Sequence, residues 1–595
     1  MPLPFNVLAS TLDALEPVTG RTLMIGMLAD MLRQADDIEV GELVYLSQGR
    51  LLPDFIQKEF GMSEMLIFRS VAQAFKAQND EVGARFKALG DAGLVAQEFA
   101  EKAEGRRLPG LDEGLSLKSV YDHLMKITQA VGSGSQEAKV TLLASVLSQL
   151  SPQEVKHVAR IVVGRLRVGI GDPTLMDALS FARAGDKSLR APIERAYNLT
   201  TDLGLVARTL YASGVAGLEA IQVKVGNPVR MALAERANNA EDIVGRLGKC
   251  AVEPKFDGFR MQIHKDGEEI SIFSRGLEDL SGMFPDVVKS VHDQISARQA
   301  IIEGEALAYD PQTGVYYPFQ VTSQRRRVHD IEAMSTTLPL RLMAFDVLLI
   351  DGNDLTRAPY TERRAALEAA IKPQVGLGGI QPSTVIYTED PDEIVTFYEE
   401  SLVEGLEGIV AKRLDGTYEA GKRGFNWIKL KRSYNTELRD TVDCVIVGYY
   451  YGKGRRAAWG IGSLLVSAYD KATDTFPTVT RVASGLSDQG WRDLCARLEA
   501  DRIPHPDPRV ISIISPDLWV VPRYVVELQA DEVSRSQMHP AGRSDGGPGY
   551  ALRFPRIVKE RPDRSPEDST STLEVIELYN MQGKGDTRGK KKREE

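Results

Sequence analysis

The chain has 595 residues, of which 43% are hydrophobic and 26% are charged. These values exclude a disordered or fibrous chain, and the length predicts three or four domains of roughly 150 residues each. The net charge of −10 excludes a protein that is basic over its whole surface, but it leaves room for a local basic face that binds nucleic acid.

The N-terminal sequence MPLPFNVLASTLDALEP has no cationic start followed by an apolar run, and the chain contains no stretch of about 18 apolar residues. We therefore expect a cytoplasmic protein that does not span a membrane. The cysteines Cys250, Cys444 and Cys495 lie far apart and form no CxxC pair. This spacing predicts buried thiols, and it supports neither a disulfide framework nor a zinc site.

Up to about residue 222 the sequence predicts an all-α region, because apolar residues recur three and four positions apart and strand-like alternation is scarce. Two helix starts are marked. Ser151-Pro152-Gln153-Glu154 combines an N-cap serine, a proline and a capping-box glutamate. At Gly171-Asp172-Pro173-Thr174, a glycine loop is expected to lead into a second capped helix.

The loop between these two helices carries Arg165, Arg167 and Gly169. Two guanidinium groups beside a helix N-terminus are suited to a DNA phosphate. Arginines near a glycine turn are more often simply solvated, and for this loop taken alone we favour that interpretation.

A break at Gly226-Asn227-Pro228 ends the helical pattern, and strand-like segments dominate after it. From Cys250 the chain predicts a strand, a tight turn at Asp266-Gly267 and a second strand. Further strands are predicted at residues 300–306, 340–350 and 408–412, with a helix at residues 361–371. The pattern favours an α+β domain.

A third segment begins near Leu438 and is predicted to form a small β-barrel, because short strands alternate with glycine-rich turns. The expected strands span residues 442–450, 463–469 and 478–482. From Gly583 the chain is rich in lysine and arginine. We interpret this tail as disordered and solvated, with a DNA-gripping arm as the alternative.

The motif Lys255-Phe256-Asp257-Gly258 is a candidate for covalent chemistry, although Lys-x-Asp-Gly arises by chance in about one in ten chains of this length. A free lysine has a pKa of about 10.4 and is protonated at neutral pH. It becomes a nucleophile where cations, a metal or desolvation expose its lone pair.

Other residues could supply that environment. In one predicted strand, Lys429 and Lys431 share a face and either bind a phosphate or form the solvated side of the strand. Glu305 and Glu407 lie in apolar contexts where an unpaired carboxylate is costly, so they are either metal ligands or members of salt bridges. Phe345 is either a core residue or a platform for a base.

Taken in order, these elements resemble the motifs of ATP-dependent DNA ligases of the archaeal and eukaryal replicative type. The resemblance covers nearly the whole chain and begins with the nucleotidyl-lysine motif EPKFDGFR at residues 253–260. The other matching segments are residues 165–178, 273–276, 302–306, 344–352, 407–412, 427–432, 553–556 and 561–563. The match at residues 165–178 reverses our preference for a solvated loop there.

The resemblance implies a multi-domain fold. It consists of an all-α DNA-binding domain (residues 1–224), an α+β nucleotidyltransferase or adenylation domain (residues 229–434) and a β-barrel OB-fold domain (residues 438–568). The basic tail (residues 583–595) follows.

The resemblance also implies roles for individual residues. Lys255 is the implied nucleophile, Glu253 the contact at the adenine edge and Phe345 its stacking partner. The residues implied to bind the nucleotide are Glu253, Arg260, Arg275, Glu305, Phe345, Arg423, Lys429 and Lys431. Those implied to bind metal are Glu305 and Glu407, and those implied to orient pyrophosphate are Arg553 and Arg556. Those implied to contact the DNA backbone are Arg165, Arg167 and Gly169.

The implied activity is ATP-dependent sealing of 5′-phosphate/3′-hydroxyl nicks in duplex DNA, through lysyl-AMP and adenylated DNA, in replication, repair and recombination. The implied cofactors are ATP and Mg²⁺, with Mn²⁺ as an alternative. We expect a monomer that binds nicked double-stranded DNA near the nucleoid of a prokaryote of archaeal type. Sliding-clamp binding lacks a clear peptide, because residues 97–114 contain no aromatic pair.

Three rival hypotheses share some of these features. An RNA ligase or mRNA-capping guanylyltransferase would share the catalytic motifs, but the helical N-terminal region speaks against it. An NAD-dependent ligase is disfavoured because the cysteine-rich zinc module of that family is absent. A non-catalytic DNA-binding scaffold is disfavoured because every expected motif residue is present.

Overall fold

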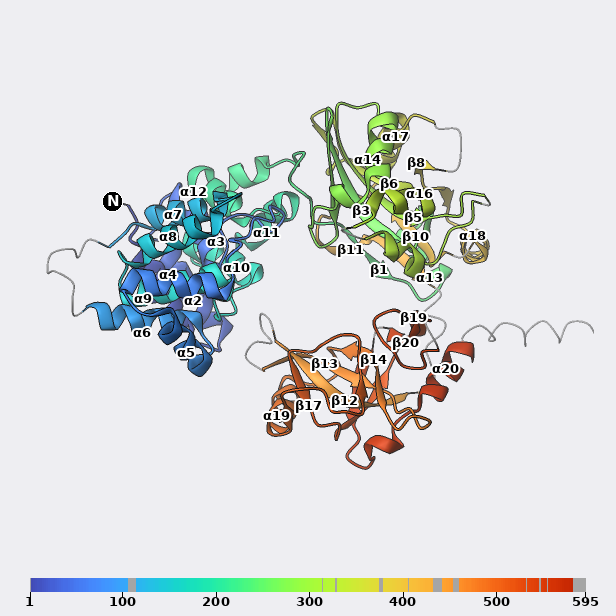
Figure 1. Cartoon of the computed structure of the whole chain (residues 1–595). Coiled ribbons are helices and arrows are strands. Elements are labelled where there is room, and N and C mark those ends of the chain that lie inside the picture. Colours follow the sequence, from blue (N-terminus) through green and yellow to red (C-terminus); the bar gives the residue numbers. More distant parts are fainter. Residues whose placement is uncertain are drawn as a thin grey trace, which may run out of the picture.

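The computed structural model forms three lobes that follow one another along the chain (Figure 1). In Figure 1 the N-terminal lobe runs from blue to blue-green, the middle lobe is green to yellow and the C-terminal lobe is orange to red. The structure describes residues 2–104, 114–312, 314–326, 329–373, 378–404, 406–431, 441–452, 460–530, 532–544, 547–553 and 555–581. The predicted basic tail and half of the stretch examined for a clamp-binding peptide lie outside the described residues.

The N-terminal lobe is helical, which confirms the all-α prediction. Its helices are α1 (Phe5–Leu15), α2 (Arg21–Leu32), α3 (Glu39–Ser47), α4 (Glu64–Phe75), α5 (Asn79–Leu89), α6 (Ala92–Glu104), α7 (Leu117–Gln129), α8 (Ser135–Leu147), α9 (Pro152–Val163), α10 (Asp172–Ala184), α11 (Arg190–Thr200) and α12 (Leu203–Ala220). Their apolar faces form one large cluster of buried side chains, including Leu8, Val158 and Ala178. The lobe therefore has a hydrophobic core of its own.

The two predicted helix starts differ in outcome. At α9 the capping box is present, because the Ser151 side chain accepts from Glu154 N–H and the Glu154 carboxylate accepts from Ser151 N–H. At α10 the expectation of a capped start is wrong, because Gly171 precedes the helix without a side-chain cap. The Asp172 carboxylate accepts instead from Gln48 and from Tyr197, which joins α10 to α3 and α11.

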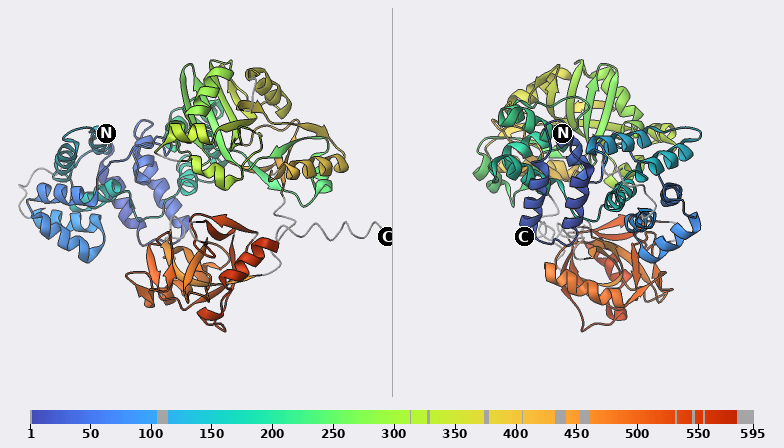
Figure 2. Two further views of the ribbon diagram at one scale, coloured as in Figure 1. Left: turned by 45° about the vertical axis from the view of Figure 1, so that its right-hand side comes forward. Right: turned by 90° about the vertical axis from the view of Figure 1, so that its left-hand side faces the viewer.

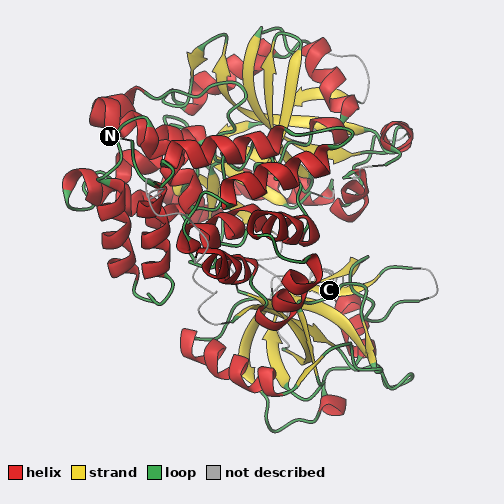
Figure 3. Cartoon of the chain, turned by 60° about the vertical axis from the view of Figure 1, so that its left-hand side comes forward, coloured by secondary structure: helices red, strands yellow, loops and turns green. Residues whose placement is uncertain are grey.

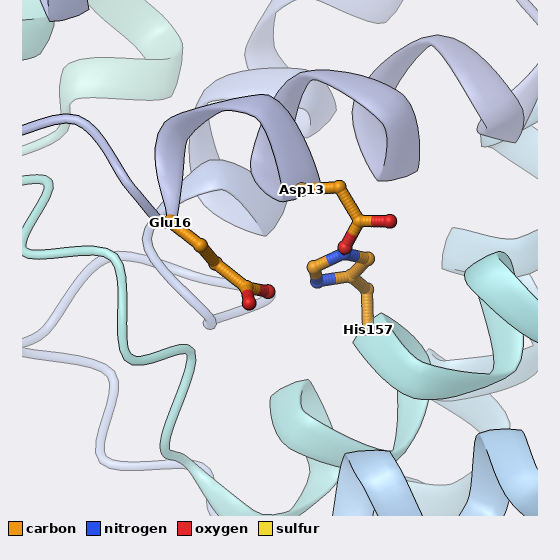
Figure 4. Close-up of side chains that lie close together, drawn as sticks. All are labelled: Asp13, Glu16 and His157. Atoms are coloured by element: carbon orange, nitrogen blue, oxygen red, sulfur yellow. The ribbon is translucent and has the colours of Figure 1, made fainter.

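Three potential metal ligands lie together where α1 meets α9, namely Asp13, Glu16 and His157 (Figure 4). Their ligand atoms lie within 4.8 Å of one another. Lys156 Nζ lies 2.7 Å from Asp13 Oδ1 and 2.6 Å from Glu16 Oε1, and Arg160 Nη1 also lies 2.6 Å from Glu16 Oε1. Because these cations neutralise the carboxylates, we interpret the cluster as an ion-pair network that joins the two helices.

The middle lobe is an α+β domain, as predicted. Its strands are β1 (Leu233–Arg236), β2 (Cys250–Lys255), β3 (Phe259–Asp266), β4 (Glu269–Ser274), β5 (Gln299–Ala308), β6 (Leu340–Ile350), β7 (Asn353–Asp354), β8 (Gly379–Pro382), β9 (Ile386–Thr388), β10 (Gly408–Arg413) and β11 (Arg423–Lys431). Its helices are α13 (Ala240–Leu247), α14 (Pro285–Gln294), α15 (Phe319–Thr322), α16 (Ile331–Thr337), α17 (Tyr360–Ala370) and α18 (Pro391–Val403), with the 3-10 turns η1 (Ser281–Met283) and η2 (Ser323–Arg325). The strands expected at residues 340–350 and 408–412 and the helix expected at residues 361–371 match these elements to within one residue, and the strand expected at residues 300–306 is extended in β5 to Ala308.

Two sheets form this lobe, and each carries helices on its outer face. One sheet has the strand order β1-β11-β10-β2-β9, and α13 and α18 bury its apolar side. The other has the order β4-β3-β5-β6-β7, with β8 beside β6, and α14 and α17 pack on it. A smaller apolar cluster that includes Ile301, Leu348 and Trp427 joins the two sheets. The faces of the two sheets that these helices leave uncovered therefore look toward each other.

The C-terminal lobe is rich in strands, as expected, and its main sheet is curled (Figure 3). Its strands are β12 (Val442–Tyr451), β13 (Ile461–Ser467), β14 (Phe476–Val482), β15 (Arg502–Ile503), β16 (Val510–Ile511), β17 (Leu518–Val520), β18 (Val525–Gln529), β19 (Glu532–Ser536), β20 (Gly549–Arg553) and β21 (Arg556–Glu560). Its helical elements are α19 (Asp488–Ala500), η5 (Pro566–Asp568) and α20 (Thr572–Met581). One edge of β12 pairs with β13, while the other pairs first with β18 and then with β17, so the sheet bends around its core.

The segment between the N-terminal and middle lobes is held by hydrogen bonds to both. Arg230 N–H donates to the Asn198 carbonyl of α11 (2.8 Å). In the other direction, Gly226 N–H donates to His264 Nδ1 (3.0 Å) and Val229 N–H donates to Gln262 Oε1 (2.6 Å). The connection therefore runs directly over the sheet that carries β3.

None of the described helices has the length and apolar character that a membrane crossing requires. All three cysteines are free thiols, and Cys250 and Cys444 are buried, which confirms the expectation for these two residues. Cys495 is partly exposed.

Candidate active site

The register of three adjacent strands brings the predicted site residues into rows. Gly408 on β10 lies opposite Lys255 on β2 and Lys431 on β11. Two residues further along β10, Val410 lies opposite Glu253 and Lys429. Because side chains alternate along a strand, these residues share one face of the sheet. The structure thus confirms that Lys429 and Lys431 share a face and adds that Lys255 shares it with them.

Glu407, which directly precedes β10, joins the two lysines of the first row. Its carboxylate forms ion pairs with Lys255 (Nζ···Oε2, 2.5 Å) and with Lys431. Its backbone N–H donates to the Lys255 carbonyl (2.9 Å). Burial, together with the charge of Lys255, lowers the pKa of Lys431 to about 8. The same two causes lower the pKa of Lys429, so this face of the sheet concentrates positive charge around Lys255.

Two glycines make this crowding possible. A Cβ on Gly258 would lie 2.3 Å from the Ala306 carbonyl oxygen, so the loop after Lys255 packs directly on β5. A Cβ on Gly408 would lie 2.1 Å from the Leu430 carbonyl oxygen, and the φ of this residue is +143°. Only glycine fits such backbone contacts without displacement. Steric crowding against β5 therefore explains why the Lys-x-Asp-Gly motif has a glycine at position 258.

Glu305 reaches the site from the opposite sheet. Its Oε1 accepts a hydrogen bond from Gly258 N–H (3.2 Å), which fixes the carboxyl beside the loop that follows Lys255. Burial raises the pKa of Glu305 to about 7, although the charges of Lys255 and Arg260 oppose this shift. A carboxyl group in this environment gains from a nearby cation.

Glu253 is almost fully buried and is surrounded by donors. Tyr360 Oη donates to its Oε1 (2.5 Å), Ser383 Oγ donates to its Oε2 (2.6 Å) and Lys412 Nζ lies 2.9 Å from Oε1. Lys412 also donates to the Phe345 carbonyl (2.7 Å). The charge of Glu253 is thereby compensated inside the protein, and the side chain is fixed in place.

Arg260 is positioned by a second buried network. Its guanidinium donates to the Ala232 carbonyl (2.8 Å) and to Glu303 Oε2 (2.9 Å). Glu303 also accepts from Tyr418 Oη (2.8 Å) and from Gln262 Nε2 (3.1 Å). Because Gln262 also binds the segment between the lobes, the position of Arg260 is tied to the connection with the N-terminal lobe.

These side chains surround a cavity of about 600 Å³ between the two sheets of the middle lobe. The predicted site residues that line it are Glu253, Lys255, Arg260, Arg275, Glu305, Phe345, Arg423 and Lys429. Phe345 exposes part of its ring there and meets Trp427 edge to face, with ring centroids 6.0 Å apart. The cavity thus combines an aromatic surface with cationic and carboxylate groups, as nucleotide sites do.

The remaining predicted site residues lie elsewhere. Arg553 ends β20 and Arg556 begins β21, both in the C-terminal lobe. The charges of Glu532 and Arg553 act on Lys431, so the β19–β20 hairpin lies within electrostatic range of the site. Figure 1 shows this hairpin on the side of the C-terminal lobe that faces the middle lobe, and Figure 2 gives two further views of the lobes.

The predicted DNA-backbone residues lie between α9 and α10. Arg165 and Gly169 are exposed. Arg167 has a φ of +60° and donates to the Gly90 carbonyl (2.7 Å), and its guanidinium lies 3.3 Å from Asp91. The loop is therefore shaped by contacts within the N-terminal lobe, and its role in DNA binding stays a prediction.

Several residues of the site had no assigned role in the sequence analysis. Tyr360 lies 107 positions from Glu253, and neither it, Ser383 nor Tyr418 belongs to a local pattern that marks it. Lys412 fell inside a matched motif but received no function. Arg326 also lines the cavity, and the adjacent arginines beginning at Arg325 were a signal that could have identified it.

Taken together, the geometry offers a lysine among cations, a partly apolar recess for a planar ring and two carboxylates suited to a hard cation. Such a set can transfer a phosphoryl group through a covalent phosphoramidate on lysine. An aromatic side chain with buried polar neighbours can select the base of a nucleotide.

Comparison with known families agrees with this chemistry. The model described as "DNA ligase N terminus" matches residues 4–180, and "ATP dependent DNA ligase domain" matches residues 231–431. The model described as "ATP dependent DNA ligase C terminal region" matches residues 457–564. The three matches follow the order of the three lobes.

Individual relatives match over nearly their full length. A protein named "Probable DNA ligase" from Dictyoglomus thermophilum is 48% identical over 584 residues, which cover 98% of each chain. A DNA ligase from Sulfurisphaera tokodaii is 40% identical over 590 residues, which cover 97% of this chain and 98% of the relative. The solved structure "Pmar-Lig_PreS3" covers 93% of this chain and 99% of its own, with a TM-score of 0.51 and 16% identity, and so shares the fold.

The close approach at Gly258 yields a stability prediction. In Gly258→Ala the new Cβ must push the loop away from β5, so we expect the free energy of unfolding to fall by about 1–3 kcal/mol. Gly282→Ala is the matched control, because a Cβ there meets nothing within 4 Å. Chemical denaturation of both variants measures the difference, and equal losses would contradict the steric explanation.

The buried imidazole of His264 yields a pH prediction. Burial lowers its pKa from 6.5 to about 3, so between these values the unfolded chain binds a proton that the folded chain does not. This group therefore makes stability fall as the pH falls below 6.5, by at most about 1.4 kcal/mol per pH unit.

Thermal melting between pH 4 and pH 8 tests this. The melting temperature of His264→Gln should depend less on pH than that of the wild type, whereas His505→Gln, which removes an exposed histidine, should behave like the wild type. Identical pH profiles for the wild type and His264→Gln would show that the imidazole titrates freely.

Proposed function

Because the chain belongs to the ATP-dependent DNA ligase family, whose members seal nicks in DNA, we propose that Lys255 is the nucleophile that carries AMP. The observation that supports this assignment best is the row of Lys255, Gly408 and Lys431 with Glu407 beside it. The neighbouring cations, Lys429 and Lys431, favour the neutral amine of a lysine next to them.

In the proposed first step, the lone pair of Lys255 Nζ attacks the α-phosphorus of ATP. A P–N bond forms, the bond to the bridging oxygen breaks and pyrophosphate leaves with that electron pair. The ammonium group loses one proton to solvent before the attack and a second as the P–N bond forms, so that Nζ keeps one hydrogen. The positive side chains of Arg423, Lys429 and Lys431 attract the triphosphate and stabilise the charge that develops on pyrophosphate. Lys255 must first leave Glu407, which the arrival of the triphosphate favours.

The recess between the sheets would hold the nucleoside. Phe345 offers a partly exposed ring for stacking on adenine, and Glu253, which lines the same cavity, would contact the adenine edge. Arg260 and Glu305 are placed to contact the ribose, and Arg275 the AMP phosphate or the nick. The buried hydrogen bonds of Glu253 and Arg260 pre-organise this recess.

Glu305 and Glu407 fit a divalent metal ion. Glu305 lines the cavity and Glu407 contacts Lys255, so both offer hard oxygen ligands beside the lysine. The raised pKa of Glu305 is the mark of a carboxyl without sufficient compensating charge. Mg²⁺, with Mn²⁺ as the alternative, would neutralise phosphate charge there. Within the chain, Glu305 is held by Gly258 N–H and Glu407 by two lysines, so both carboxylates are oriented toward Lys255.

In the later steps, AMP passes from Lys255 to the 5′-phosphate at a nick, which breaks the P–N bond and forms an anhydride. The 3′-hydroxyl then attacks the activated phosphate, the new phosphodiester forms and AMP leaves. These steps join a 5′-phosphate to a 3′-hydroxyl in duplex DNA, as replication, repair and recombination require.

The other lobes would supply DNA contacts and pyrophosphate orientation. We assign a DNA-binding domain to residues 1–224, the adenylation domain to residues 229–434 and an OB-fold to residues 438–568. The curled sheet around β12 and the closeness of Arg553 to Lys431 support this assignment. Arg556 would assist Arg553 with pyrophosphate.

Arg165, Arg167 and Gly169 would contact the DNA backbone, which makes binding salt-sensitive and largely independent of sequence. We further propose a monomer in the cytoplasm of a prokaryote of archaeal type. Sliding-clamp binding stays an open alternative, for which residues 97–114 supply no aromatic pair.

Labelling experiments test the proposal. The protein is incubated with ATP, GTP or NAD labelled in the transferable nucleotide, and nicked duplex DNA is then added. We expect labelling by ATP, release of the label by nicked DNA and joining of the strands, because the recess is built for adenine and Lys255 forms the bond.

Lys255→Ala should abolish labelling, whereas the exposed neighbour Lys249 is the control, and Lys249→Ala should label normally. Labelling by GTP alone would favour a capping guanylyltransferase. Labelling that persists in Lys255→Ala would remove Lys255 from its assigned role.

A further inference from the structure

Two charged residues line the catalytic cavity without a role in the steps above. Arg326 directly follows η2, and Glu278 lies in the segment after β4. Arg326 Nη2 lies 2.5 Å from Glu278 Oε2, and both side chains are nearly half exposed, at 47% and 44%. An ion pair with this exposure contributes little to stability, so the fold does not depend on it.

The backbone that carries Arg326 is fixed by its neighbour. Arg325 has a completely buried side chain and forms an ion pair with Asp286 of α14 (2.5 Å). Its guanidinium also lies over the ring of Phe284, 5.8 Å from the centroid. Arg325 therefore anchors the segment in the core, while its neighbour Arg326 lines the cavity.

Glu278 belongs to the turn that carries Arg275. Ser274 Oγ accepts from Gly276 N–H (3.1 Å) and from Glu278 N–H (3.2 Å), and it lies 3.3 Å from Glu278 Oε2. Arg326 thus contacts a carboxylate of the same turn that carries Arg275, and all three residues line the cavity.

Glu278 also faces the N-terminal lobe. It lines a second hollow of about 890 Å³ whose other walls are mainly residues 49–63, including Arg50 and Lys58. The pair of Arg326 and Glu278 therefore lies where the catalytic cavity meets the side of the helical lobe. The triphosphate-binding candidates Arg423 and Lys429 lie on β11, in the other sheet.

We propose that Arg326 binds a backbone phosphate of the nicked DNA strand beside the reacting ends, and that Glu278 holds this arginine when DNA is absent. The inference rests on the proposed function and extends it by one DNA contact. A guanidinium binds phosphate through strong, often bidentate hydrogen bonds, and a half-exposed carboxylate is a weak competitor. When the DNA strand binds, Arg326 therefore leaves the Glu278 carboxylate and binds the phosphate instead.

The alternative is that the pair only braces the turn around Arg275. The two hypotheses predict different effects of removing Arg326 and of removing Glu278. A brace is broken equally by removing either partner, whereas a phosphate ligand is lost only when the arginine is removed. The number of ions released on DNA binding also changes only for a phosphate ligand.

The experiment compares Arg326→Ala, Arg326→Lys and Glu278→Gln with the wild type. Binding is measured with a nicked duplex that lacks the 3′-hydroxyl, over a range of salt concentrations, and sealing is measured with a pre-adenylated nick. In Arg326→Ala we expect affinity and sealing to fall about 10- to 100-fold and the slope of log K against log salt to decrease in magnitude by about 0.9. Arg326→Lys should retain the salt slope and part of the affinity.

Glu278→Gln should bind the nicked duplex as tightly as the wild type or more tightly, because the arginine is freed. Lys289→Ala is the control, since it breaks an exposed ion pair with Asp293 on α14, in the same lobe. Equal losses in Glu278→Gln and Arg326→Ala, or an unchanged salt slope in Arg326→Ala, would overturn the inference. The proposed function is tested independently of this inference, because it would be contradicted if the wild type did not form lysyl-AMP.

Discussion

The candidate active site is organised around Glu407, which is shared between the ammonium groups of Lys255 and Lys431. Strand register places the two lysines on either side of Gly408, and the missing side chain of Gly408 lets β10 pack closely against the backbone of β11. Two ammonium groups that contact the same carboxylate would repel each other if that anion were absent. A carboxylate fills that place in the free protein, and the phosphates of a nucleotide are the natural replacement. The same contact that stabilises the resting site therefore prepares it for its substrate.

Around this centre, most buried charges are already compensated. Glu253 is balanced by Lys412, and Glu303 is balanced by Arg260, each with tyrosine hydroxyl groups that complete the hydrogen bonds. Such networks are costly to break but keep side chains in one position. Glu305 is the exception, since burial raises its pKa to about 7. The compensated carboxylates, Glu253 and Glu303, therefore shape the recess, whereas the carboxyl group of Glu305, which lacks an ion-pair partner of this kind among the described residues, is suited to a metal ion.

The catalytic lobe is also tied mechanically to the helical lobe. Asn198 of α11 donates to the Ala420 carbonyl (2.9 Å), and a Cβ on Gly421 would collide with that asparagine. The nearby Tyr418 reaches Glu303, which holds Arg260. A movement of the N-terminal lobe could therefore be transmitted to Arg260 in the nucleotide recess through a short series of hydrogen bonds. The C-terminal lobe approaches the site mainly through the charges of β19 and β20.

The sequence by itself determined the order of the three lobes, which are helical, α+β and strand-rich, and the capping box at α9. It also marked the motif residues around Lys255. Periodicity, capping and motif spacing are local properties of a sequence, so they can be recognised without a structure. The sequence also predicted that Lys429 and Lys431 share a face. It could not predict that Asp172 joins helices instead of capping one, nor that Tyr360, Ser383 and Tyr418 hold the recess, because these contacts join residues distant in the chain. Only the tertiary structure, through strand register and the packing of two sheets, decided which charges meet: Lys255 with Glu407, Glu253 with Lys412 and Arg326 with Glu278.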